Sequence, residues 1–332
     1  MSVPPYSDKT ARAVREDVAV VLVNYRGAGD TIEALESLLA ADPAPGLLVV
    51  VDNASGDDSV ARLEEWALGS GVAAARLSEA GGGRSAGGAR LLIIEATANH
   101  GFGGGVNVGV RALGRSASYV VLINNDATVD PGFLGPVLAV LDADKTVGLA
   151  GGTIRYAPPR EGVWFAGGEL VWLQSRGRHL HLPPDRVRDI TFCTGCYMVV
   201  RRDSYDVAGG MPECYFLYQE DVEFSARLRA AGYRLVHVPD SVVYHKVSAT
   251  AGSRRVSPGT AYLASRNRLW FARRNLAWPR RLAATAWVLL DETNRALGAL
   301  LRGSADVSRA VLRGLVHGLL RRWPRHGPAR YE

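Results

Sequence analysis

Two short, valine-rich apolar runs flank an amphipathic segment near the start of the chain, and this pattern limits the fold more than any other feature. The runs are Asp17 to Tyr25 and Leu47 to Val51. Continuous apolar runs of this length are typical of strands buried on both faces, as in a parallel sheet. Between them, Asp30 to Ala40 carries apolar residues at helical spacing, with Asp30 as a candidate cap. The sequence therefore predicts a β-α-β unit.

The same alternation continues along the chain. A second helix is expected at Ser59 to Leu68, followed by strands at Leu91 to Glu95, Tyr119 to Asn124 and Val147 to Gly151. Strands that alternate with helices predict an α/β fold with a mainly parallel, doubly wound sheet. The glycine-rich stretch from Ala80 to Gly88 is expected to be a flexible insertion without chemistry.

The regular pattern breaks between Thr153 and Asp189, where proline, glycine, tryptophan and arginine follow no period. A long functional loop and a small antiparallel excursion both fit such a stretch. Apolar patterning returns at Cys196 to Val200, and again in a helix-like segment that begins at Glu220 and that Gly232 closes.

Composition excludes several classes of protein. Of the 332 residues, 47% are hydrophobic and 22% are charged, which is ordinary for a folded domain and unlike a disordered chain. The three cysteines, Cys193, Cys196 and Cys214, are too few and too odd in number for a disulfide framework, and no secretory signal is recognisable. The CxxC spacing of the first two lacks a second pair or a nearby histidine for zinc. We expect semi-buried thiols and a reducing cytoplasm.

Charge is distributed unevenly along the chain. Residues 251–332 carry 16 arginines and four acids, a net charge of +12, whereas residues 1–250 carry a net charge of −6. A basic tail on an acidic body predicts an anionic partner, such as membrane headgroups, a lipid diphosphate or nucleic acid. A tail that is merely solvated fits the same charge pattern.

Four polar loops follow strand-like runs, and parallel strands would bring all four to one edge of the sheet, where such folds bind nucleotides. Asp52 can accept a hydrogen bond from a ring N–H of a pyrimidine, and Asn53 or Ser55 can complete the contacts to base or ribose. A helix cap is the structural alternative for Asp52. The four loops are Asn24 to Arg26, Asp52 to Ser55, Asn99 to Asn107 and Asn124 to Asp126.

The glycine-rich loop fails the G-x-G-x-x-G pattern of dinucleotide sites, because Val106 and Val108 stand where the third glycine belongs. A redox cofactor is therefore disfavoured. A turn before a helix predicted at Val106 to Leu113 could instead offer backbone N–H groups to a diphosphate.

Asp126, just after a predicted strand, would repel a diphosphate unless a cation lay between them. Its carboxylate therefore predicts a bridging Mg²⁺ or Mn²⁺, although a solvated strand-to-helix turn would also place an acid here. His245 could add a nitrogen ligand, which favours Mn²⁺, or could be an ordinary hydrogen-bonded histidine.

Glu220 and Asp221 open the last helix predicted in the body of the chain. Adjacent carboxylates there point in different directions, so one can face the cleft while the other caps the helix or pairs with arginine. Asp221 is the candidate general base. A charged first turn without a catalytic role is the common alternative.

Seven motifs occur in order along the chain: VVLVNYR, VVVDNASGDDS, NHGFGGGVNVG, LINNDATVDPGFL, TGCYMVVRRDSYDVAGGMPECYFLYQEDVEFSARLRAAGY, VPDSVVYHK and RNRLWFARRN. Together they resemble the inverting family-two glycosyltransferases with the GT-A fold, especially bacterial rhamnosyl- and galactofuranosyltransferase-like members. The resemblance runs from Val18 to about Asn275.

The resemblance implies roles for individual residues. Asp52 is similar to the base-binding acid, Asp126 to the surviving metal ligand of a DxD-type motif, Asp221 to the catalytic base, and His245 to the histidine near the metal. An acceptor would contact Gly195 and Glu220. The implied nucleotide-sugar site comprises Asn24, Arg26, Asp52, Asn53, Ser55, Asn99, Gly103, Gly104, Gly105, Asn107 and Asn125.

The implied reaction is an in-line displacement. Asp221 removes a proton from the acceptor hydroxyl, which attacks the anomeric carbon while the metal-bound nucleotide leaves, so the configuration inverts. The expected donor is a UDP- or dTDP-sugar with a rhamnose-like or galactofuranose-like sugar. The expected acceptor is a glycan or a polyprenyl-diphosphate-linked glycan in cell-surface polysaccharide synthesis. No nucleic-acid partner is expected.

Two departures from the family pattern affect this transfer of roles. Asn124 occupies the first position of the DxD-type motif, which leaves the metal to Asp126 and His245. His100 and Val106 replace residues common in relatives, which bears on the identity of the donor sugar.

Two other functions compete with this one. A sugar nucleotidyltransferase should have a glycine-rich signature with Arg or Lys close to its first strand, whereas VVLVNYRGAGDT has one separated pair of glycines and no lysine. A catalytically silent sugar-nucleotide-binding protein should have lost Asp126 or Asp221, and both are present.

The expected organisation is an N-terminal tail (1–17), a GT-A catalytic domain (18–250) and a basic helical extension (251–332). Within the catalytic domain, residues 18–125 would mainly bind the nucleotide, and residues 126–250 the metal and the acceptor.

The longest apolar run of the extension, Leu282 to Leu290, is too short to span a bilayer, which takes about 20 residues. Apolar residues at helical spacing predict an amphipathic helix, with Arg281, Arg295 and Arg302 on a separate stripe. Such a helix could pack on the catalytic domain, but the positive charge favours peripheral attachment at the inner face of the cell membrane. The apolar stripe comprises Ala286, Leu289, Leu290, Thr293, Leu297, Leu300 and Leu301.

Overall fold

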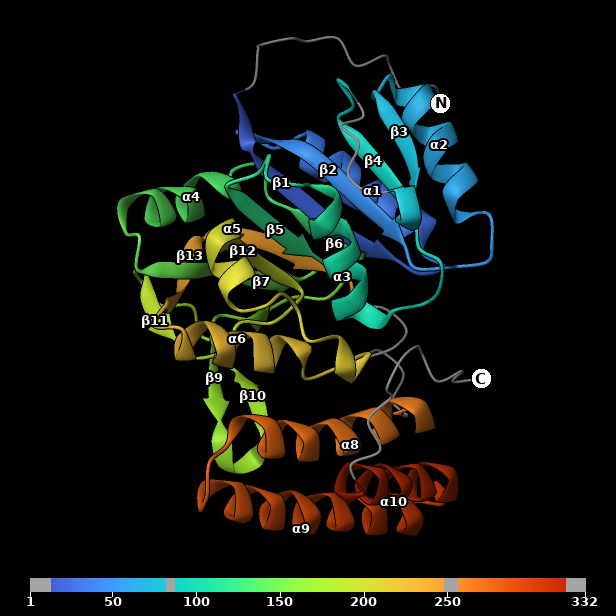
Figure 1. The fold of residues 1–332 in the computed structure, drawn as a ribbon, viewed down its shortest axis with the longest axis vertical. Coiled ribbons are helices and arrows are strands. Elements are labelled where there is room, and N and C mark those ends of the chain that lie inside the picture. Colours follow the sequence, from blue (N-terminus) through green and yellow to red (C-terminus); the bar gives the residue numbers. More distant parts are fainter. Residues whose placement is uncertain (1–12, 82–86, 248–255, 321–332) are drawn as a thin grey trace.

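The computed structural model describes residues 13–81, 87–247 and 256–320. Its centre is an eleven-stranded sheet with helices on both faces, and three further helices lie at one end of the molecule (Figure 1). The strand order is β11-β13-β7-β12-β5-β1-β2-β4-β3, with β6 beside β13 and β8 beside β7. The sheet is mixed but mainly parallel, as the sequence predicted.

The amino-terminal half forms the parallel part of the sheet. The valine-rich runs are its central strands, and they are buried because helices cover both of their faces. β3 was not predicted, since it lies at the edge and its residues alternate between exposed and half-buried. The strands are β1 (Val14–Asn24), β2 (Ala44–Asp52), β3 (Ala74–Ser78), β4 (Leu91–Glu95) and β5 (Tyr119–Ile123).

Three helices connect these strands. α1 (Ala28–Leu39) and α2 (Ser59–Ser70) follow β1 and β2 as the chain moves outward, and α3 (Gly101–Ala112) returns from β4 to β5. Because crossovers between parallel strands are right-handed, this reversal places α3 on the opposite face from α1 and α2. The reversal makes a switch point between β1 and β5, where open α/β sheets bind ligands.

The second half adds antiparallel strands to the sheet. β12 (Tyr197–Arg201) lies antiparallel between β5 and β7 (Val147–Tyr156), whereas β13 (Arg234–His245) runs parallel to β7. The irregular stretch before β12 contains an antiparallel hairpin of β9 and β10, which confirms the small antiparallel excursion. The other elements here are β6 (Ala127–Val129), β8 (Val163–Phe165), β9 (Gly168–Val171), β10 (Arg176–His179), β11 (Arg188–Ile190), α4 (Leu134–Ala143), α5 (Arg202–Val207) and α6 (Glu220–Ala230).

The basic extension contains α8 (Pro258–Asn275), α9 (Arg280–Leu301) and α10 (Ala305–Leu319). α8 lies between the sheet domain and the other two helices (Figure 1), and its Trp270 and Phe271 belong to the main hydrophobic core. The predicted boundary near residue 250 falls outside the described residues. Within the described part of the chain, no helix is long and apolar enough to cross a membrane.

α3 begins at Gly101, so the prediction of a turn followed by a helix from Val106 was wrong. The glycines of the loop are part of the helix, where they allow it to approach β1 closely. A Cβ atom added at Gly109 would lie 2.5 Å from Val21 Cγ1, and one added at Gly105 would lie 2.8 Å from a methyl group of β1. Side chains at these positions would push α3 away from the sheet.

We predict that Gly109→Ala lowers the free energy of unfolding by about 1–3 kcal/mol, because the clash with β1 outweighs the better helix propensity of alanine. Gly69→Ala in α2 is the matched control, since nothing lies within 4 Å of a Cβ added there. The control should be neutral or slightly stabilised. Urea titrations would measure both variants, and equal stabilities would contradict the close approach of α3 to β1.

Candidate active site

Polar residues gather at the carboxyl ends of β1, β2, β5 and β13. Asn24 and Asp52, the last residues of β1 and β2, are paired across the parallel strands. The Asn124 to Asp126 loop follows β5, and His245 ends β13. Three of the four predicted loops therefore reach one edge of the sheet, and most of the fourth forms the first turns of α3.

Asp52 is buried and held by its neighbours. Its Oδ1 accepts hydrogen bonds from Asn24 Nδ2 (2.7 Å) and Ser55 Oγ (2.5 Å), and its Oδ2 accepts one from Ser55 N (3.1 Å). Arg26, which has a φ of 56°, donates through Nε to Ser55 O (3.0 Å). Asp52 does not cap α2, whose N-cap is Asp58. The loops after β1 and β2 are thus joined by hydrogen bonds around this carboxylate.

Asn125 connects the β5 loop to this cluster through α1. Its Nδ2 donates to Thr31 Oγ1 (3.2 Å), and Thr31 Oγ1 donates to Asn24 Oδ1 (2.9 Å). A Cβ atom added at Gly27 would lie 2.7 Å from Asn125 Nδ2. Thr31 and Gly27 were missed in the sequence because one lies within a helix and the other is the residue just before that helix. They help to align the two sides of the switch point.

Asn53 joins the β2 loop to the start of α3. Its Nδ2 donates to Asn99 Oδ1 and to Gly101 O, both at 3.0 Å, and its Oδ1 accepts from His100 N (2.9 Å). Gly101 N in turn donates to Asn99 Oδ1 (2.9 Å). The side chains of Asn53 and Asn99 are therefore occupied in shaping this loop.

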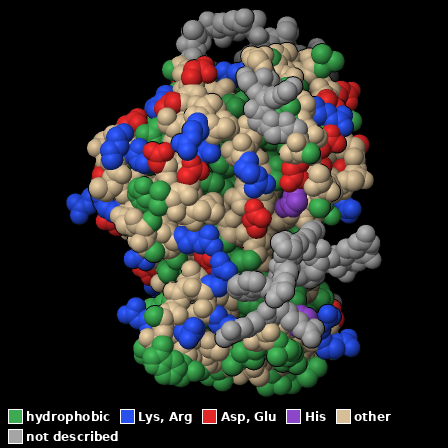
Figure 2. Space-filling view, viewed as in Figure 1, with side chains coloured by type: hydrophobic (Ala, Val, Ile, Leu, Met, Phe, Trp, Pro, Cys, Tyr) green, Lys and Arg blue, Asp and Glu red, His purple; other side chains and the backbone are tan. Residues whose placement is uncertain are grey.

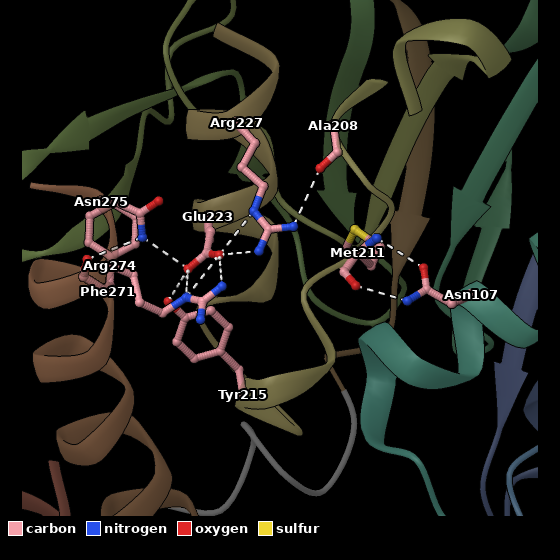
Figure 3. A network of polar contacts seen from close by, with 9 residues as sticks. All are labelled: Asn107, Ala208, Met211, Tyr215, Glu223, Arg227, Phe271, Arg274 and Asn275. Atoms are coloured by element: carbon pink, nitrogen blue, oxygen red, sulfur yellow. Dashed lines mark hydrogen bonds and ion pairs between the residues drawn. The ribbon is translucent and has the colours of Figure 1, made fainter. Parts of the chain in front are cut away.

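Asn107 and the glycines before it face the protein interior. Asn107 Nδ2 donates to Met211 O (2.9 Å) and Glu213 Oε1 (2.7 Å), and its Oδ1 accepts from Met211 N at 2.9 Å (Figure 3). A Cβ atom added at Gly103 would lie 3.0 Å from Pro212 O. These residues hold α3 against the loop that precedes α6.

Asp126 and His245 lie side by side and are largely buried. His245 Nε2 is 3.0 Å from Asp126 Oδ1, and Asn124 Nδ2 is 3.4 Å from the same ring nitrogen. Trp164 packs edge-on against the imidazole, with ring centroids 4.8 Å apart. The structure therefore brings together the two metal ligands predicted from the sequence.

The spacing of this pair is that of a hydrogen bond, and it is also compatible with two ligands of one divalent cation. Two ligands at right angles, each about 2.1 Å from an octahedral cation, are about 3 Å apart, which matches the separation of these two atoms. Among the described residues, no group of three or more His, Cys, Asp or Glu side chains could hold a metal. Mg²⁺ or Mn²⁺ would therefore need further oxygen ligands from substrate and water, as is usual for Mg²⁺.

Asp221 lies in the first turn of α6 and is partly exposed. Gly195 N donates to its Oδ2 (3.1 Å), and Val222 N donates to its Oδ1 (2.8 Å). The removal of water around the carboxylate raises the pKa of Asp221, although these backbone hydrogen bonds act in the opposite direction. A raised pKa suits a carboxylate that must accept a proton near neutral pH.

Glu220 points into the protein, so the two adjacent carboxylates point in different directions as predicted, but its side chain does not cap α6, and no ion pair with arginine is found for it among the described residues. It is buried, and its Oε2 has no hydrogen-bond partner within the described residues. Burial, followed by the nearby charge of Asp221, raises the pKa of Glu220. When protonated, Glu220 adds no negative charge beside the candidate base.

The CTGC segment, residues 193–196, connects the two acidic parts of the site. Gly195 N donates to Asp221 Oδ2 (3.1 Å), and the next residue, Cys196, accepts from Asn124 N through its carbonyl oxygen (3.0 Å). Both thiols of the segment are buried, and burial raises their pKa, so they remain protonated. The CxxC spacing therefore reflects packing, and the segment places the candidate base next to the β5 loop.

The loop before α6 is held by the first part of the RNRLWFARRN motif, which the sequence left without a role. Asn267 Nδ2 donates to the carbonyl oxygens of Tyr215 (3.1 Å), Leu217 (2.9 Å) and Tyr218 (2.8 Å). Arg266 Nη2 also donates to Tyr215 O (2.9 Å). A buried Arg-Asn pair among large apolar residues was the available signal. The loop contains three non-glycine residues with positive φ: Phe216, Tyr218 and Gln219.

Glu223, on the inner side of α6, anchors this helix to α8 (Figure 3). Its carboxylate accepts hydrogen bonds from Arg274 Nε (3.0 Å) and Asn275 Nδ2 (2.9 Å). It also accepts from the hydroxyl of Tyr215 and from the guanidinium of Arg227. The end of α8, the loop before α6 and α6 itself thus share one buried charge.

Two family models match the chain. The model of glycosyl transferase family 2 matches residues 19–208, and that of glycosyl transferase family group 2 matches residues 119–299. The first match covers the loops around Asp52 and Asp126, and the second covers Asp221, His245 and most of the terminal helices.

Curated proteins similar to this chain include two sugar transferases. The N-acetylglucosaminyl-diphospho-decaprenol L-rhamnosyltransferase of Mycobacterium tuberculosis is 27% identical over 254 residues, which are 69% of this chain and 81% of that protein. The low-salt glycan biosynthesis hexosyltransferase Agl10 of Haloferax volcanii is 22% identical over 273 residues, which are 78% of this chain and 76% of that protein.

Solved structures show the same fold. The mannosyltransferase PcManGT from Pyrobaculum calidifontis, in complex with GDP-Man and Mn²⁺, has a TM-score of 0.56 at 18% identity, covering 94% of this chain and 89% of that one. Residues 1–349 of S. aureus TarS, in complex with UDP-GlcNAc, have a TM-score of 0.57 at 14% identity. This match covers 91% of this chain and 81% of that one. The chain has a GT-A-like fold and belongs to glycosyltransferase family 2.

Proposed function

We propose that this chain transfers a sugar from a nucleoside-diphosphate sugar to an acceptor hydroxyl, with inversion at the anomeric carbon. One observation carries the proposal. The carboxylate of Asp221 is joined to the loop of Asp126 by a single short backbone segment, because Gly195 bonds the first and Cys196 bonds Asn124. A base for the acceptor and a cation site for the leaving diphosphate are what a direct displacement requires.

The base of the nucleotide would lie over the ends of β1 and β2. Among the described residues, Asp52 Oδ2 accepts one hydrogen bond, from Ser55 N, so it retains a lone pair for a ring N–H. Uracil and thymine present the same ring N–H, so this contact fits a UDP- or a dTDP-sugar equally. Asn24 and Arg26 would keep the carboxylate and its loop in place.

The diphosphate would depend more on a cation than on α3. The N–H groups of Gly101 and Phe102 already have acceptors within the protein, namely Asn99 Oδ1 and Phe216 O. Gly103 and Gly105 pack against the loop before α6 and against β1, so the predicted contact of these glycines with the diphosphate is not part of the proposal, and Asn125 would border the site. When bound, Mg²⁺ or Mn²⁺ held by Asp126 and His245 would offset the negative charge of the diphosphate.

Asp221 would act on the acceptor. Its carboxylate takes the proton of the acceptor hydroxyl as the oxygen attacks the anomeric carbon, and the nucleoside diphosphate leaves from the opposite side. The acceptor would lie against Gly195 and the start of α6, with the buried side chain of Glu220 beneath it. Attack from one face and departure from the other invert the configuration.

A rhamnose-like or galactofuranose-like sugar and a glycan or polyprenyl-diphosphate-linked acceptor complete the proposal, which places the enzyme in cell-surface polysaccharide synthesis. The similarity of this chain to an N-acetylglucosaminyl-diphospho-decaprenol L-rhamnosyltransferase and to a hexosyltransferase of glycan biosynthesis supports it. Mn²⁺ in the complex of a structural neighbour supports a divalent cation.

Asp221→Asn should lower turnover by about 10²–10⁴-fold while donor binding stays within about twofold, because an amide keeps the shape of the carboxylate but cannot take the proton. Mass spectrometry would follow transfer from dTDP- and UDP-sugars to a lipid-linked diphosphate acceptor. Asp206→Asn, on the exposed side of α5, is the control and should keep its activity. Near-native turnover of Asp221→Asn would refute the assignment of the base.

Asp126→Ala should weaken the binding of UDP or dTDP in the presence of Mn²⁺ by about tenfold or more, and EDTA should do the same to the unmodified chain, because the cation neutralises the bound diphosphate. His245→Ala should act in the same direction with a smaller effect. Calorimetric titration would measure these affinities, with Asp185→Ala in an exposed loop as the control. Equal affinity with and without EDTA would show that the site needs no metal.

The rate should also fall at acid pH. A base works only when deprotonated, so kcat/KM should decrease as the pH falls through the pKa of Asp221. Because burial raises that pKa, the acid limb should lie above the ordinary aspartate value of 3.8. Rates and nucleotide affinities measured from about pH 8 to about pH 4.5 would separate catalysis from binding. A flat rate profile over this range would be inconsistent with Asp221 as the base.

A further inference from the structure

The outward face of α9 is apolar and uncharged. Its leucines are between 52% and 80% exposed. None of the five charged residues of this helix shares that face, because they fall toward the side that contacts the protein. The outward leucines are Leu282, Leu290, Leu297, Leu300 and Leu301.

α10 extends the same surface. Leu312, Val316 and Leu319 follow one another at helical spacing and are exposed. Figure 2 shows the hydrophobic side chains gathered along the end of the molecule formed by α9 and α10. Apolar patches of this extent mark sites of interaction. The outward leucines of α9, together with these three residues of α10, are called the terminal apolar face below.

The inner side of α9 has the opposite character. Its buried residues are mostly small, namely Ala284, Val288, Ala296 and Ala299, together with Glu292, which pairs with Arg268. A helix whose only partner is its own protein turns its large apolar residues inward. α9 turns its leucines outward, so its sequence fits a second apolar partner.

The charge around the face points to an anionic partner. Arg309 and Arg313 border the apolar residues of α10 and are exposed. Residues 256–320 contain ten arginines and three acids, a net charge of +7. Trp278 is 68% exposed and Trp287 is 40% exposed. Exposed tryptophan is enriched where a protein meets the boundary between water and lipid.

A cleft at the edge of the terminal apolar face is lined by both arginine and apolar side chains. Its volume is about 680 Å³. Arg273 and Arg281 line it, and so do Leu282 and Leu319 of the terminal apolar face, whereas Arg274 in the same lining is paired with Glu223. Anionic headgroups would lie next to both kinds of residue here, whereas a second copy of this chain would bring two positive surfaces together.

We propose that the terminal apolar face docks on the surface of an anionic lipid bilayer, with α9 and α10 in the plane of the interface. The leucines would enter the boundary between headgroups and acyl chains, and the arginines would contact the headgroups. The proposal goes beyond the catalytic function and uses none of the site residues.

Flotation of the full chain with vesicles tests it. The chain should float with vesicles of phosphatidylglycerol and phosphatidylcholine in equal parts, less so at high salt, and little with phosphatidylcholine alone. Leu290→Glu combined with Leu297→Glu should lower the bound fraction about tenfold or more. Arg309→Gln and Arg313→Gln should each weaken binding about fivefold at low salt.

Matched controls carry the same changes elsewhere. Leu68→Glu combined with Val207→Glu alters exposed residues of α2 and α5, and Arg62→Gln alters α2. These controls should float like the unmodified chain. All variants should bind UDP or dTDP equally, so a failure of docking is distinguishable from a failure of the proposed enzyme.

Two results would overturn the proposal. The first is no flotation of the unmodified chain with the anionic vesicles, or an equal loss in the controls. The second is a dimer in light scattering without vesicles that Leu290→Glu combined with Leu297→Glu converts to a monomer, because the face would then bind a second copy of the chain.

Discussion

The buried carboxylate of Glu223 holds the candidate catalytic helix and the terminal helices in one frame. Burial alone would raise the pKa of Glu223, but hydrogen bonds from Arg274, Tyr215 and Asn275 outweigh that effect and lower it. A charge persists in a protein interior only when it is paired in this way. Because α6 carries both Glu223 and Asp221, the position of the candidate base depends on α8, which the sequence assigned to a separate extension.

Much of the fold could be predicted because it depends on local patterns. The valine-rich strands are buried on both faces, and the parallel sheet follows from the helices between them. Asn24 and Asp52, at the carboxyl ends of two such strands, had to reach the same edge, and the structure pairs them. Asp126 and His245 were predicted from the sequence as ligands of one metal, and they meet because β6 and β13 are neighbours in space.

The parts that could not be predicted depend on contacts between residues far apart in the chain. Glycine has a low helix propensity, so the start of α3 at Gly101 is invisible locally, yet Phe102 N bonds Phe216 O there at 2.8 Å. Asn267 likewise shapes a loop almost fifty residues before it, as its bonds to Leu217 and Tyr218 show. No period or spacing in the sequence encodes such partners.

The helical period of apolar residues in the terminal helices could be read from the sequence, but the side of the protein that each apolar stripe faces could not. An amphipathic stripe shows that a helix has an apolar side without showing what that side meets. In the structure, α8 gives its Trp270 and Phe271 to the core, and α9 keeps its leucines outward. α8 therefore holds the loop before Asp221 on one side and supports the terminal apolar face on the other. The same helix fixes the distance and the orientation between the candidate base and any surface on which that face docks.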